Sequence, residues 1–279
     1  MKALATALSK THNSATPMNI GPYHSLDKAF RVLELVAARS PRGVTEIADE
    51  LGLEKSNVSR LLKTLSAMGY VVQSARRGQY QMGPRILVLA QGYLERDRIV
   101  VEAQPILRAL AQEARATAHL GVIVEGQTIV VAKEPSPEQI QVATRVGARI
   151  SPHASALGKV LLAGLPEATH TRALAGPLPR FTEKTITDRK KLLGILREVR
   201  RKGYAFESEE EHRGVGCIGA PVMDSSGRWI AALSVAGPLH GTPFRLNRSH
   251  LAMVLRKAKE LSLKLSVAED GPRLLSPTD

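Results

Sequence analysis

A short helix that is predicted to begin at Lys55 carries the side chains best suited to bind a polyanion. Its outward face combines short polar groups with cations and contains almost no acid. Arginine and asparagine pair with the edges of guanine and adenine in the major groove, and cations neutralise phosphates. The pattern therefore favours a helix that reads double-stranded DNA, with an ordinary amphipathic helical hairpin as the alternative. The residues expected at or near the DNA are Thr45, Lys55, Ser56, Asn57, Ser59, Arg60 and Lys63, with Asn57 and Arg60 expected to reach base edges.

Two helices joined by a tight turn are predicted to position these side chains. Thr45 is expected to cap the first helix, which covers residues 45–51. Gly52 can take the positive φ that ends this helix, and Leu53 is expected to be a buried turn residue. The second helix has apolar residues at the spacing i, i+3, i+4, i+7, which predicts one buried face. These residues are Val58, Leu61, Leu62 and Leu65.

A β-hairpin is predicted directly after the second helix. Residues 71–73 and 79–82 have strand character, and the turn between them contains Arg76 and Arg77. We expect these arginines to contact phosphates or the minor groove, although a solvated basic turn is the alternative. An earlier amphipathic helix, capped by Ser25, is expected to end before Pro41. Together these elements predict a winged helix-turn-helix domain over residues 25–85.

Composition and charge set limits on the partner and the compartment. The chain has 279 residues, enough for two domains, and a formal net charge of +13 that suits a polyanionic partner. A second basic cluster, in residues 189–202, is expected to be a solvated helix face. Aromatic residues make up only 4%, which argues against binding of single strands by base stacking. Cys217 is the only cysteine, and no apolar run has membrane-spanning length, so a cytoplasmic protein is expected.

The rest of the sequence indicates a second domain of the α+β class. Residues 1–24 are predicted to be a mobile tail, residues 86–104 a linker helix with an apolar stripe for dimer contact, and Pro105 the first residue of another helix. Mixed helices and hairpin strands then favour a largely antiparallel sheet within residues 105–270, followed by a tail over 271–279. The expected strands cover residues 120–124, 128–132, 140–146, 217–223 and 229–235, and the expected helices 156–165, 187–202 and 247–266.

From about His24 to Ser266 the chain resembles the IclR-type transcriptional regulators. The resemblance rests on the segments GVTEIADELGLEKSNVSRLLKTLSAMGYV, GQYQMGPRILVLA, SPHASALGKVLLA, RRKGYAFESEEEHRGVGCIGAPVMDSSG and IAALSVAGP. The fourth segment is the most specific, through its glycines, Glu210 and Cys217. The resemblance implies an N-terminal winged helix, a C-terminal GAF-like domain that binds a small effector, and dimers or dimers of dimers on palindromic operators. No cofactor is expected.

The same resemblance implies a binding site for a small organic acid. The motif HASALGK places two backbone N–H groups where an anion could bind, and such groups at a helix start suit a carboxylate. Two positions depart from the family pattern. Glu207 stands where aspartate is usual, and Ala236 stands where some relatives have serine, so the pocket is expected to differ from those that bind small keto acids. The implied effector-binding residues are Ala156, Leu157, Glu207, Cys217 and Ser234.

Two other function classes compete with a ligand-responsive regulator. An enzyme that uses Cys217 is weakly supported, because glycines and apolar residues surround this cysteine and nothing nearby lowers its pKa. Gly158 and Lys159 lack the rest of a phosphate-binding loop, and the GxSxG, HExxH and CxxC motifs do not occur. An architectural DNA-binding protein without an effector would leave the second domain unexplained. The sequence therefore predicts a regulator of transcription, tied to a catabolic pathway and without catalytic residues.

Overall fold

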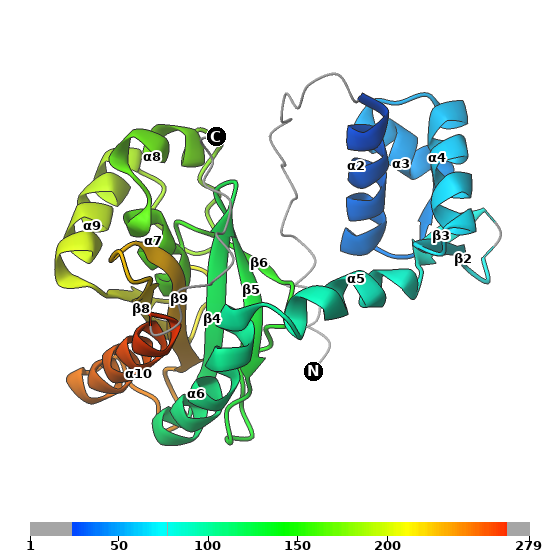
Figure 1. Cartoon of the computed structure of the whole chain (residues 1–279). Helices are drawn as coiled ribbons and strands as arrows, with labels where there is room; N and C mark the ends of the chain where they lie inside the picture. The colour runs from blue at the N-terminus through cyan, green and yellow to red at the C-terminus, as the bar shows by residue number, and fades with distance from the viewer. Residues whose placement is uncertain (1–23, 77, 267–279) are drawn as a thin grey trace. The chain divides into compact units, whose positions relative to one another are not determined.

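The computed structural model describes residues 24–76 and 78–266, which form two compact units divided between Tyr93 and Leu94. The N-terminal unit is drawn in blue to cyan in Figure 1. Its elements are α2 (His24–Ala38), β1 (Arg42–Gly43), α3 (Val44–Leu51), α4 (Lys55–Ala67), β2 (Val71–Gln73), β3 (Gln79–Met82) and α5 (Arg85–Leu94).

The three helices α2, α3 and α4 of this unit pack around one apolar core. Val58 and Leu62 of α4 are fully buried, as are Val36 of α2 and Ile47 of α3. The turn between α3 and α4 has the predicted geometry, because Gly52 ends α3 with a φ of 64°. The strands form an antiparallel sheet in the order β1-β3-β2, so β3 lies between the other two. The predicted helix-turn-helix and wing are confirmed, and β1 is an additional strand.

The predicted starts of two helices in this unit are wrong. Gly43 is the N-cap of α3, and its backbone N–H donates to Glu46 Oε2 at 3.1 Å. Thr45 is therefore an exposed residue of the first turn and not the cap. Helix α2 already includes His24, so Ser25 lies within the helix. Pairing of β1 with β3 carries the chain into α3 at Gly43, which local sequence preferences did not reveal.

The C-terminal unit is built on a six-stranded antiparallel sheet in the order β6-β5-β4-β9-β8-β7. Figure 1 shows helices on both faces of this sheet. The elements are α6 (Arg98–Ala114), β4 (Thr117–Val124), β5 (Gln127–Glu134), β6 (Arg149–Ile150), α7 (Ala156–Gly164), α8 (Glu167–Ala173), α9 (Arg189–Lys202), β7 (Ala205–Ser208), β8 (Val215–Met223), β9 (Trp229–Pro238) and α10 (Arg248–Ser266).

Two apolar cores cover the two faces of the sheet. Helices α6 and α10 pack on one face, where Leu107, Leu120 and Leu261 are fully buried. Helices α7 and α9 pack on the other, where Val160, Leu192 and Leu196 of the helices meet Ala232 of β9. The α+β class and the antiparallel sheet are as predicted. Among the described residues, no helix is both long and apolar enough to cross a membrane.

The linker and one strand differ from the prediction. Helix α5 ends at Leu94, and α6 begins at Arg98 because the Asp97 side chain accepts the N–H groups of Ile99 and Val100 at 3.0 and 3.4 Å. Pro105 therefore lies inside α6 rather than at its start, and the expected boundary between residues 104 and 105 falls within this helix. Residues 140–146 form a loop and not a strand. Strands β6 and β7 and helix α8 were not expected.

Candidate functional site

The outward face of α4 presents the predicted polar and basic side chains. Lys55, Ser56, Arg60 and Lys63 are exposed, whereas Asn57 and Ser59 are partly buried. Arg60 Nη2 donates to Asn57 Oδ1 at 2.5 Å, so the two expected base-contacting side chains are already joined. The helix contains no Asp or Glu. The helix itself therefore offers cations and hydrogen-bond donors, and the nearest acid in the sequence is its N-cap residue, Glu54.

Two further regions carry the other expected DNA contacts. Thr45 is exposed in the first turn of α3. Arg76 is exposed in the turn between β2 and β3, where its backbone N–H lies 3.4 Å from Ser74 Oγ. Arg77 lies outside the described residues.

A cavity of about 50 Å³ in the C-terminal unit brings together four of the five expected effector-binding residues. Leu157, Glu207, Cys217 and Ser234 line it, whereas Ala156 is fully buried but is not part of the wall. The other wall residues are His119, Val142, Thr144, Ile150, Ser155, Glu211, His212, Val215 and Ala236.

The start of α7 forms one wall of this cavity. Ser155 caps the helix, because its Oγ accepts the N–H of Gly158 at 3.0 Å. A Cβ atom on Gly158 would lie 2.5 Å from both Cα and the carbonyl oxygen of Pro152. Glycine at this position therefore lets residues 152–155 pack against the helix start, which places Ser155 and Leu157 at the cavity.

Replacing Gly158 with alanine is expected to lower the free energy of unfolding by about 1–3 kcal/mol, because rigid backbone atoms must move. Gly194 in α9 is a matched control, since a Cβ atom there would meet nothing within 4 Å. Alanine at Gly194 is expected to stabilise the helix by roughly 0.5–1 kcal/mol. Urea unfolding of both variants tests the pair. Equal effects of the two substitutions would contradict the packing described for Gly158.

Strand pairing in the sheet brings together the polar side chains that line the rest of the cavity. Glu207 of β7 is paired with Cys217 of β8, and His119 of β4 is paired with Ser234 of β9. Glu207 Oε1 accepts the backbone N–H of Glu210 at 2.5 Å, and His119 Nε2 lies 2.5 Å from Thr144 Oγ1. Sequence reasoning missed His119, Thr144, Glu211 and His212 as wall residues. Their spacing in the sequence carries no signal, because sheet register and loop packing unite them.

Burial controls the protonation of the cavity's titratable groups. It raises the pKa of Glu207 to about 8 and the pKa of Glu211 to about 7, in each case against hydrogen bonds that oppose the shift. Burial, helped by the charge of Lys133, lowers the pKa of His119 to about 3. Burial and the nearby Glu207 raise the pKa of the Cys217 thiol to about 12. The cysteine is therefore a neutral wall group and a poor nucleophile at neutral pH.

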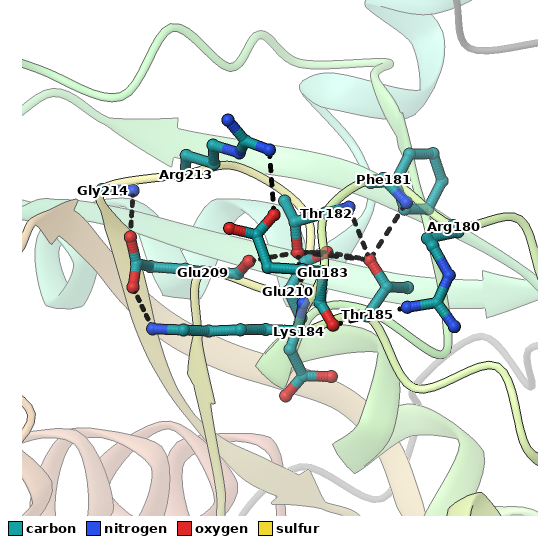
Figure 2. Close-up of polar contacts among 10 residues, drawn as sticks. All are labelled: Arg180, Phe181, Thr182, Glu183, Lys184, Thr185, Glu209, Glu210, Arg213 and Gly214. Atoms are coloured by element: carbon teal, nitrogen blue, oxygen red, sulfur yellow. Dashed lines mark hydrogen bonds and ion pairs between the residues drawn. The ribbon is translucent and has the colours of Figure 1, made fainter.

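A polar network holds the segment from Glu209 to Gly214, which carries two wall residues. Figure 2 shows Thr182 and Thr185 donating to the backbone carbonyls of this segment. Lys184 pairs with the Glu209 carboxylate, which also accepts the N–H of Gly214 at 2.8 Å. These contacts join the loop before α9 to the loop between β7 and β8, and so fix the wall that contains Glu211 and His212.

A buried ion pair lies behind the cavity. Lys159 of α7 is only 2% exposed, and its Nζ contacts Glu210 Oε1. The sequence motif drew attention to Glu210 but did not predict its partner. The pair ties α7 to the same segment that the threonines hold, so α7 and the loop after β7 are linked by charge as well as by packing.

Comparison with known proteins identifies the family. Residues 25–75 match the family described as IclR helix-turn-helix domain, and residues 91–267 match Bacterial transcriptional regulator IclR C-terminal. The regulator BhcR of Paracoccus denitrificans is 34% identical over 253 residues, which cover 90% of each chain. KdgR of Escherichia coli is 31% identical over 243 residues, which cover 86% of this chain and 92% of the relative.

Solved structures give the same answer for the fold. A crystal structure of an IclR transcriptional regulator from Alicyclobacillus acidocaldarius has a TM-score of 0.75 and 26% identity, and the match covers 87% of this chain and 97% of the other. These relatives regulate transcription and are not enzymes, which removes the enzymatic alternative for Cys217. The chain belongs to the IclR family of bacterial transcriptional regulators.

Proposed function

We propose that this DNA-binding regulator acts in the cytoplasm as a homodimer or dimer of dimers on a palindromic operator. A small organic acid, bound in the cavity of the C-terminal unit, alters its DNA binding or transcription. The observation that carries the DNA-binding half is the outward face of α4, where Arg60 and Asn57 are hydrogen-bonded and no acid is present. Arginine and asparagine at such a position can read guanine and adenine edges.

The remaining contacts follow from the arrangement of the N-terminal unit. Lys55, Ser56, Ser59 and Lys63 surround the base-reading pair on α4, while Thr45 and the wing arginines Arg76 and Arg77 would bind the DNA backbone or the minor groove. Two modules in a dimer read half-sites separated by one or more helical turns, each about 34–36 Å.

Helix α5 supports the dimer. Leu87, Val88 and Leu89 are 67%, 70% and 58% exposed, and Tyr93 is 37% exposed. Leu89 and Tyr93 are four residues apart and share one face of the helix, and a second copy of the helix would bury this face. This is the dimer contact expected from the apolar stripe of the linker.

The effector would bind among Leu157, Glu207, Cys217 and Ser234, beside the start of α7, to which Ala156 and Leu157 belong. Serine supplies a hydroxyl, and the thiol of Cys217 supplies a small, weakly polar wall. We expect the dimer to adopt two arrangements that differ in the spacing of its DNA-binding modules. The ligand can change DNA affinity only if its own affinity differs between these two arrangements. An architectural protein without an effector is the alternative, and calorimetric titration with small acids separates the two.

The substitutions Arg60→Ala and Ser234→Ala are expected to separate the two functions. Arg60→Ala should weaken binding to operator DNA by roughly 10-fold to 100-fold, the worth of one bidentate base contact, and should leave ligand affinity nearly unchanged. Ser234→Ala should weaken the ligand and spare the DNA. Fluorescence anisotropy with the DNA upstream of the regulator's own gene measures the first, and calorimetry the second.

Lys190→Ala is the matched control for Arg60→Ala, because it removes one exposed cation from α9 of the C-terminal unit. It should leave DNA affinity within about twofold, since Lys190 belongs to no element of the DNA-binding unit and its exposed charge is screened by salt. Loss of DNA binding of the same size in both variants would show that net charge, and not the α4 contact, governs affinity.

A further inference from the structure

The cavity contains carboxyl groups but no cation to meet an acid. Glu207 and Glu211 both line it, and its remaining polar groups are imidazoles, hydroxyls and one thiol. Among the residues that the structure describes, the wall includes no Lys or Arg. An ionised Glu207 would repel a carboxylate ligand strongly in this buried position. An acid can therefore bind here only if the wall supplies donors in place of positive charge.

The start of α7 supplies one part of what an anion needs. Ser155 and Leu157, in its first turn, line the cavity. The N–H of Gly158 already donates to Ser155 Oγ, and the backbone of Leu157 is hydrogen-bonded to Cys217, so this wall acts on an anion through the partial positive charge of the helix dipole. Lys159 lies one turn further along and is buried against Glu210. This wall favours an anion over a cation.

Glu207 lines the same cavity and is held in a fixed position. It is 4% exposed, and the backbone N–H of Glu210 occupies its Oε1. The carbonyl oxygen of Glu210 is in turn fixed by Thr182 and Thr185, which Figure 2 shows. A carboxyl group that accepts through one oxygen can carry a proton on the other and donate it.

We propose that Glu207 is protonated when the cavity binds a small carboxylate, and that it donates this proton in a hydrogen bond to the ligand. The proposal deepens the function above and rests on it, because it specifies how the wall recognises an organic acid. The proton is shared between two oxygens and no covalent bond is made or broken. Binding is thereby coupled to protonation, and Glu207 selects a carboxylate over an amine.

The groups that face Glu207 agree with a protonated state. Burial raises its pKa to about 8, the N–H of Glu210 and the charge of Lys159 act against this shift, and the carboxyls of Glu210 and Glu211 add to it. Cys217, its partner on β8, stays a thiol because burial raises its pKa to about 12. On the remaining walls, burial lowers the pKa of both His119 and His212, so neither imidazole supplies a compensating charge at neutral pH.

The test uses two probes with an ethyl group on the full chain: propionate and propylamine. Calorimetric titrations run from about pH 6 to about pH 9, a range in which propionate stays ionised. The dissociation constant of propionate is expected to rise about 10-fold across this range, because Glu207 loses its proton. Propylamine is expected to bind more weakly than propionate at about pH 6.

Two variants locate the effect. In Glu207→Gln the side chain donates at every pH, so the rise above about pH 8 should disappear. In Glu211→Gln, the matched control, that rise should remain, because the pKa of Glu211 is about 7 and its titration is complete earlier.

If the affinity of the wild type for propionate does not change with pH, the proposal is wrong, and this result does not depend on how any variant folds. Tighter binding of propylamine than of propionate would overturn it too, as would the absence of propionate binding at about pH 6. Operator binding by the same samples, compared with Arg60→Ala, keeps these failures distinct from failure of the proposed DNA-binding function.

Discussion

Replacing Lys159 with methionine, with Glu210 kept, is expected to lower the free energy of unfolding by about 3–5 kcal/mol. The lysine is 2% exposed and pairs with Glu210 Oε1, so its removal leaves a buried carboxyl group without the cation that contacts it. The other oxygen, Oε2, has no hydrogen-bond partner among the described residues. Methionine preserves most of the side-chain length, so the loss reports the charge rather than a cavity.

The pH dependence of this loss has a definite sign. Burial raises the pKa of Glu210, and the charge and hydrogen bond of Lys159 oppose that shift. Without the lysine, Glu210 binds a proton more readily, and a neutral carboxyl group is less costly to bury. The destabilisation by Lys159→Met should therefore shrink as the pH falls.

Urea unfolding followed by circular dichroism measures the loss, and two variants control it. The double variant Lys159→Met with Glu210→Gln removes both charges and should recover most of the stability. Lys184→Met breaks the pair with Glu209, in which the lysine side chain is 53% exposed, and should cost much less, because water screens an exposed pair. If Lys159→Met costs no more than Lys184→Met, the buried pair does not stabilise the fold.

The helix-turn-helix was predictable because its signals are local. Val58 and Leu62 repeat at helical spacing and are both fully buried, and Gly52 marks the turn by itself. The N-cap of α3 was not predictable in this way. Gly43 acquires that role because β1 pairs with β3, which lies more than 30 residues away, and Arg42 is opposite Tyr80 in that pairing.

In the C-terminal unit, the prediction of strands was correct where a strand pairs with the next strand along the sequence. Strands β8 and β9 form a hairpin across the turn that contains Asp224, whose side chain accepts the N–H of Ser226 at 2.9 Å. The strand predicted over residues 140–146 is wrong. Alternating apolar residues form a strand only where another strand is available to pair with them. The neighbouring edge of β5 pairs instead with the two residues of β6.

Only some of the residues that line the cavity could be predicted from the sequence. A family motif pointed to Leu157, Glu207, Cys217 and Ser234, which line the same cavity. His119 joins them because β4 lies beside β9, with His119 opposite Ser234. Residues 207–211 include four glutamates, which by composition favour a solvated loop, but β7 buries Glu207 against β8. Sheet order and register, which no local pattern encodes, decide these positions.

Raising the pH from about 6.5 to about 8 is expected to destabilise the wild type by about 2 kcal/mol and to have much less effect on Glu207→Gln. Glu207 has an ordinary pKa of 4.5 when unfolded, and burial raises this to about 8 in the folded chain. The folded state therefore holds a proton that the unfolded state releases. This contribution to stability is complete below about pH 4.5 and is lost as the pH rises through 8.

The window above pH 6.5 separates Glu207 from the histidines. Burial lowers the pKa of His119 and of His212 from 6.5, so both add stability as the pH rises toward 6.5 and little beyond it. Glu211, with its pKa raised to about 7, acts in the same direction as Glu207 but earlier. Urea unfolding at several pH values should therefore show a loss below about 1 kcal/mol in Glu207→Gln and most of the wild-type loss in Glu211→Gln. Equal losses in the wild type and Glu207→Gln would mean that Glu207 is already ionised in the folded chain, and the cavity would then repel a carboxylate instead of donating to it.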